Sequence, residues 1–259
     1  MPLFTLVLWG LATLLTLLLL GRSIALSQYR EFPCFFLYLA VNLCQTAVGL
    51  VLYQGYGFGS SFAYPIIWTT QGIVVVARAL AAAEVCHQVL GSYKGIWALA
   101  ARVLALSGVL VLSLSLYFGR RSYHVGIITL EISLEAGIAT CIAGLFLFAR
   151  YYQIRVQPAT GLVGLGLGLL SCFKILNDLV FERFLKINGV SWNYASSFSF
   201  VGILLIWTLA LRQPVAARLT EPKLKSALVY ANLIPQVNRQ LAELNEQLTQ
   251  LWHVESPKS

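Results

Sequence analysis

The sequence predicts an all-α integral membrane protein, a bundle of seven transmembrane helices followed by an amphipathic helix. Hydrophobic residues make up 58% of the 259-residue chain and charged residues only 11%, whereas soluble domains carry about 25% charged residues. The mean hydropathy is +0.76. Seven apolar segments each reach about 20 residues, the length of a helix that crosses a bilayer. The last part of the chain has a different, seven-residue hydrophobic pattern.

The seven apolar segments are separated by short polar connections. The first has no basic residue before it, which predicts a retained helix rather than a cleaved signal peptide. Together they form a predicted transmembrane domain over residues 1–211, with spans at 3–26, 34–53, 65–90, 96–118, 126–149, 161–181 and 192–211.

The distribution of cations between these segments predicts the orientation. If the N-terminus lies outside, nine lysines and arginines fall on the inner side and four on the outer side. This excess predicts an N-out, C-in protein of the cell (inner) membrane, and it explains the net charge of +8 without a nucleic-acid partner. The inner cations are Arg22, Arg30, Lys94, Arg150, Arg155, Arg212, Arg218, Lys223 and Lys225; the outer ones are Arg120, Arg121, Arg183 and Lys186.

Two of the predicted helices carry charges where they should contact hydrocarbon. Glu131 and Glu135 lie four residues apart in one, and Lys174 and Asp178 lie four apart in the other, beside Asn177. Residues at this spacing share one helix face. Counted from the outer face, Glu131 lies about 9 Å deep, Glu135 about 15 Å and Lys174 about 10 Å. We therefore expect the Lys174 ammonium between the two glutamates, with Asp178 nearer water.

This arrangement leaves one carboxylate in excess. Burial and a like-charged neighbour favour the protonated form of such a group, so it is a candidate site for a proton or a ligand. The alternative is a purely structural ion pair that fixes the register of the two helices. Charged residues inside membrane segments favour a functional role, although both roles occur.

The third predicted helix adds Gln71 and Arg78, seven residues apart on one face. Arg78 lies near the middle of the membrane, at a depth similar to Asn42 and Gln45 of the second helix. A polar contact among Arg78, Asn42 and Gln45 is therefore expected. An arginine at this depth also needs a negative partner, and we expect Glu135 to be that partner, which would join both polar clusters into one cavity.

Close packing is predicted between the fifth and sixth helices. Gly164 and Gly168 form a G-x-x-x-G motif that allows close approach of two helices. Small residues of the fifth helix are the expected neighbours, namely Ala136, Thr140, Ala143 and Gly144.

Sequence motifs for catalysis, metals and cofactors are not found. The chain contains no P-loop, dinucleotide fingerprint or serine-hydrolase elbow. Glu84 and His87 form one E-x-x-H pair, but a di-iron site needs two such pairs. No metal, no cofactor and no enzymatic activity are expected.

The C-terminal part is predicted to be cytoplasmic. Residues 212–233 form a basic juxtamembrane linker, and residues 234–252 form a helix with a heptad pattern. We expect this helix to form a homodimeric coiled coil through 234–251 or to contact a protein partner; the alternative is a single amphipathic helix on the membrane surface or against the bundle. Its seam consists of Ile234, Val237, Leu241, Leu244, Leu248 and Leu251.

The seven helices and the helix at 234–251 together resemble, at the level of architecture, the seven-helix membrane sensor regions of some bacterial histidine kinases and cyclases. Those regions also run N-out, C-in and continue into a cytoplasmic signalling helix. The resemblance implies a non-enzymatic sensor or receptor-like protein; this chain departs from it by ending without an output domain. The alternatives are a small transporter or channel, and a structural subunit of a membrane protein assembly.

Overall fold

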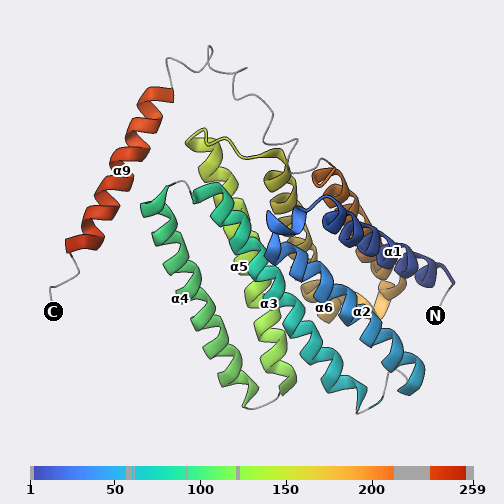
Figure 1. The fold of residues 1–259 in the computed structure, drawn as a ribbon. Helices are drawn as coiled ribbons and strands as arrows, with labels where there is room; N and C mark the ends of the chain where they lie inside the picture. The colour runs from blue at the N-terminus through green and yellow to red at the C-terminus, as the bar shows by residue number, and fades with distance from the viewer. Residues whose placement is uncertain are drawn as a thin grey trace.

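The computed structural model of the chain describes residues 3–56, 60, 62–91, 93–120, 123–212 and 234–254. Every regular element in this part is helical, and six helices are long and apolar enough to cross a membrane (Figure 1). The all-α prediction is thereby confirmed, and six of the seven predicted spans are found as candidate membrane helices in the described part of the chain. The elements are α1 (Leu3–Ala25), a 3-10 turn (Gln28–Arg30), α2 (Pro33–Tyr56), α3 (Ala63–Leu90), α4 (Lys94–Gly119), α5 (Tyr123–Tyr151), α6 (Pro158–Ala210) and α9 (Ile234–Val254).

The sequence predicts two helices where the structure has the single 53-residue element α6. The indole Nε1 of Trp207 donates to the carbonyl of Val163 at 3.2 Å. In a straight helix these residues would lie about 66 Å apart, so α6 turns back on itself between them. The segment at 182–191 contains no proline, the residue that most strongly interrupts a helix. The part of the returning arm whose side chains are described, Tyr194–Ala210, is apolar.

Trp207 holds the returning arm against the rest of the bundle. Its side chain is fully buried and meets the rings of Phe35 at 5.0 Å and Tyr38 at 6.0 Å, both edge to face. The indole lies where a Cβ of Gly166 would be. Gly166 therefore provides the space that lets the two arms of α6 approach so closely.

The interface between α5 and α6 forms as predicted but with different partners. A Cβ on Gly164 would lie 3.2 Å from Phe146, and one on Gly168 would lie 3.1 Å from Ile142. Gly144, one of the small residues expected there, has open space around its Cβ position. Large side chains of α5 fill the notches of α6, because a notch is covered better by a projecting side chain than by another small one.

Hydrogen bonds join several helix ends at one end of the bundle. Gln28 Nε2 donates to the carbonyl of Leu211 at 2.8 Å, and Gln88 Nε2 donates to the carbonyl of Glu31 at 2.6 Å. Thr160 in turn donates to Gln88 at 2.8 Å. The α1–α2 connection, the end of α3 and both ends of α6 therefore meet at this face.

Helix α9 packs against the beginning of α4 (Figure 1). The backbone N–H of Gly95 donates to Asn245 Oδ1 at 2.5 Å, and Leu241 is fully buried. Leu244 and Leu251 remain 38% and 63% exposed. Of the alternatives for this segment, the structure therefore shows a helix packed against the bundle. The linker from residue 213 to 233 lies outside the described residues.

Candidate functional site

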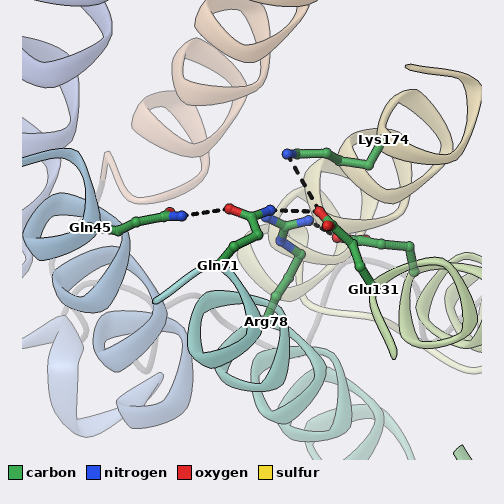
Figure 2. Close-up of polar contacts among 6 residues, drawn as sticks. Gln45, Gln71, Arg78, Glu131 and Lys174 are labelled. Atoms are coloured by element: carbon green, nitrogen blue, oxygen red, sulfur yellow. Dashed lines mark hydrogen bonds and ion pairs between the residues drawn. The ribbon is translucent and has the colours of Figure 1, made fainter. Parts of the chain in front are cut away.

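A chain of polar contacts crosses the bundle through four helices (Figure 2). Gln45 of α2 donates to Gln71 of α3 at 2.5 Å, and Gln71 donates to Glu131 of α5 at 2.6 Å. Lys174 of α6 approaches the same glutamate oxygen, with its Nζ 3.8 Å away. The predicted match in depth between Glu131 and Lys174 is confirmed by this contact.

The donor-to-acceptor direction of these hydrogen bonds follows from Glu131. An ionised carboxylate only accepts hydrogen bonds, so the amide nitrogen of Gln71 must face it. The oxygen of Gln71 then faces α2 and accepts from the amide nitrogen of Gln45. The charge on Glu131 thus determines how two amides are oriented.

Arg78 and Glu135 form the second ion pair of the site, as the sequence analysis predicted. Arg78 Nη1 donates to Glu135 Oε1, and both side chains are buried. The Arg78 guanidinium also lies 5.3 Å from the ring centre of Tyr38, a cation–π distance. Arg78 Nε and Glu135 Oε2 are buried without a hydrogen-bond partner within the described part of the chain.

The predicted position of Lys174 between two glutamates is wrong in one respect. Lys174 contacts Glu131, whereas Glu135 is occupied by Arg78. The buried guanidinium needs a full counter-charge, while Lys174 retains partial access to the surface. The four described charges therefore balance, and the expected excess carboxylate is not found among them. The side chain of Asp178 lies outside the described residues.

The expected contact of Arg78 with Asn42 and Gln45 does not form. Gln45 pairs with Gln71 instead, about two turns of α3 away from Arg78. Asn42 faces the same cavity as Arg78. Asn177 is half-buried on α6, and it is not among the described residues that line this cavity.

A cavity of about 250 Å³ is lined in part by Arg78 and Lys174, whereas Glu131 and Glu135 are not among its described lining residues. It is bounded by α1, α2, α3 and both arms of α6. Its polar lining consists of Thr13, Thr16, Asn42, Gln45, Thr46, Gln71, Arg78, Lys174, Ser196, Ser197 and Ser199, and its apolar lining of Leu8, Trp9, Ala12, Leu43, Val74, Leu170, Phe173 and Phe200.

Several hydroxyl groups of the lining already use their proton. Thr13, Thr16 and Thr46 each donate to the carbonyl four residues earlier in their own helix, at 2.8–2.9 Å. Ser199 does the same at 2.8 Å. These groups therefore present oxygen lone pairs to the cavity, whereas Arg78 and Lys174 present donors.

The sequence analysis missed the walls contributed by α1 and by the returning arm of α6. Thr13 and Thr16 are three residues apart, so they share one face of α1. Ser196, Ser197 and Ser199 interrupt an otherwise apolar segment. Both patterns were visible as polar residues within apolar segments, but neither indicates which helix lies opposite.

Glu84 and His87 have separate structural roles. The Glu84 carboxylate accepts the backbone N–H groups of Cys34 at 3.1 Å and Phe35 at 2.9 Å, so it caps the beginning of α2. The His87 ring packs edge to face on Trp97 of α4 at 4.8 Å. Within the described residues, no group of three His, Cys, Asp or Glu side chains could hold a metal ion.

A second space, of about 960 Å³, lies between α3, α4 and α5, and its lining is almost entirely apolar. Cys86 of α3 and Cys141 of α5 both line it and contact each other, with their sulfurs 3.3 Å apart. The only hydroxyls of its lining are those of Ser107, Ser133 and Thr140, and it contains no charged group among the described residues.

Comparison of the chain with protein-family models, curated proteins and solved structures finds no match.

Proposed function

We propose that this chain is a membrane sensor or receptor-like protein that binds a small ligand in its polar cavity. In this proposal the seven helical segments span the cell membrane with the N-terminus outside, and α9 lies in the cytoplasm, where it passes the signal to a partner. The observation that carries the proposal is a cavity inside an apolar bundle with two cationic side chains, Arg78 and Lys174, in its wall. Charged side chains inside a membrane segment carry a desolvation cost, and they usually mark a functional site.

Aromatic packing next to Arg78 supports binding over transport. Phe35, Tyr38 and Trp207 pack on one another next to Arg78, and all three are buried. A transport pathway would need a polar route through this half of the bundle in at least one state. A buried aromatic cluster, with Trp207 held by its hydrogen bond to Val163, does not provide such a route.

A continuous set of contacts connects the cavity with α9. Arg78 and His87 lie on the same rigid helix, α3, and His87 packs on Trp97 of α4. Trp97 lies two residues after Gly95, whose N–H is bonded to Asn245 of α9. A small shift of α3 on ligand binding would therefore reach the contact that holds α9.

Hydrogen exchange of the α9 amides tests this proposal. We expect Lys174→Met, which removes a cavity charge at similar side-chain length, to change α9 exchange rates several-fold. Thr13→Val alters the cavity wall without touching an ion pair and should change them in a similar way. Asn245→Ala, which releases α9 directly, is the positive control, and Leu106→Ala, on the exposed surface of α4, is the negative control.

Folded cavity variants with wild-type α9 exchange would contradict the sensor proposal. Uptake of a small solute into vesicles that contain the purified chain would support a transporter instead. Stoichiometric co-purification of one foreign membrane protein, together with unchanged α9 exchange, would support a structural subunit.

A further inference from the structure

We propose that the cavity ligand is a small organic monoanion, such as a carboxylate with an apolar body. This inference depends on the proposed function in one respect, namely that the cavity is a ligand site. The anionic group would contact Lys174 and Arg78, and the apolar body would lie against Trp9, Phe173 and Phe200.

The charges in the cavity wall favour an anion. Arg78 and Lys174 line the cavity, whereas Glu131 and Glu135 are not among the described residues that do so. The glutamates bind the two cations from the side of α5. A ligand in the cavity therefore meets positive charge first, while the glutamates offset the cost of keeping these cations in the bundle without a ligand.

Lys174 is available to a ligand. Its Nζ lies 3.8 Å from Glu131, longer than a charged hydrogen bond of about 2.8 Å, and its side chain is 34% exposed. If Lys174 turns towards a ligand, Glu131 keeps the hydrogen bond from Gln71. Arg78 stays paired with Glu135 through Nη1, and its buried Nε has no partner among the described residues.

The rest of the lining argues for a single negative charge. Thr13, Thr16, Thr46 and Ser199 offer lone pairs to the cavity, because each uses its own proton on a backbone carbonyl. A second anionic group placed beside these four hydroxyls would meet lone pairs, and no cation other than Arg78 and Lys174 is among the described lining residues to balance its charge. A volume of about 250 Å³ equals the space of about eight liquid water molecules, which suits a small organic acid.

Three probes of similar size and different charge test the inference on the full chain in lipid nanodiscs. Benzoate, benzamide and benzylammonium share one ring and carry a negative, a neutral and a positive group. Titration calorimetry should show saturable binding of benzoate, with benzamide and benzylammonium at least tenfold weaker. Lys174→Met should weaken benzoate binding at least tenfold.

Glu131→Gln provides the decisive variant. It keeps an acceptor for Gln71 and removes the charge that competes for Lys174, so benzoate should bind several-fold more tightly than to the wild type. A cation site would behave in the opposite way, because Glu131→Gln would then remove the counter-charge of the ligand. If Lys174→Met fails to fold, the change in ligand affinity caused by Glu131→Gln still distinguishes an anion site from a cation site.

Each contrary result has a definite meaning. Equal binding of benzamide and benzoate would overturn the anion inference while leaving the cavity as a ligand site. Tighter binding of benzylammonium, lost in Glu131→Gln, would replace the anion with a cation. If none of the probes binds, the monoanion inference is wrong, whereas the sensor proposal still stands or falls on α9 exchange.

Discussion

The polar cavity and the second, apolar space between α3, α4 and α5 (here called the apolar groove) lie on opposite sides of α3. Gln71, Val74 and Arg78 of α3 line the cavity, whereas Val76 and Ala83 line the groove. The groove is larger, about 960 Å³ against 250 Å³, yet the smaller space holds the charges. In a bilayer, lipid chains can fill an apolar groove without any cost in polar contacts, so its size alone says little about function. The polar cavity is the more informative space, because its charges must be maintained against the cost of desolvation.

The two spaces also differ in what holds their walls in place. Around the cavity, side-chain contacts join four helices through Gln45, Gln71, Glu131 and Lys174 (Figure 2). In the groove, α4 contributes mainly aliphatic side chains, and many of them are exposed. We therefore expect substitutions near the cavity to be costly and substitutions in the groove to be tolerated.

The largest effect is expected for Arg78→Met. It leaves the Glu135 carboxylate buried and unpaired, so the free energy of unfolding should fall by about 3–5 kcal/mol. The double variant Arg78→Met/Glu135→Leu should recover most of this loss, because no charge is then left without a partner. Unfolding in mixed micelles with increasing SDS measures the free energy of unfolding of the single and the double variant. Equal losses in the single and double variants would show that the ion pair is not the source of the effect.

An intermediate effect is expected where Trp207 packs against Gly166. Gly166→Val places side-chain atoms in the space of the indole, and overpacking of this kind costs about 1–3 kcal/mol. Gly144→Ala is the matched control, since its Cβ position has nothing within 4 Å. The two melting temperatures provide the comparison. A Gly166→Val protein as stable as Gly144→Ala would mean that the arms of α6 pack less tightly than described.

The smallest effect is expected in the groove. Leu112 of α4 lines it and is 50% exposed, so Leu112→Ala should change the free energy of unfolding by no more than about 0.5 kcal/mol. The same SDS unfolding measurement applies. A loss of unfolding free energy comparable to that of Arg78→Met would show that the groove is as important for stability as the cavity. It would indicate that whatever fills the groove contributes to folding.

Much of the membrane fold could be predicted from local sequence. Long apolar segments produce membrane helices wherever the chain places them, because each helix satisfies its own backbone hydrogen bonds. The position of a residue in a helix also gives its height along the helix axis and the helix face on which it lies. The heights of the charged residues were enough to predict the Arg78–Glu135 pair and the Glu131–Lys174 contact. Height alone could not assign Lys174 to one glutamate. That pairing depends on the tertiary packing, which places Arg78 beside Glu135.

Other features depended on how the helices are arranged around one another. The polar walls on α1 and on the returning arm of α6, the placement of Trp207 against Gly166, and the docking of α9 on Gly95 all join residues far apart in the chain. Hydrophobic periodicity says which face of a helix is polar but not which helix that face meets. The local sequence therefore determined which segments are helices and how far along its helix each charge lies. The cavity exists only because tertiary packing brings five polar helix faces together.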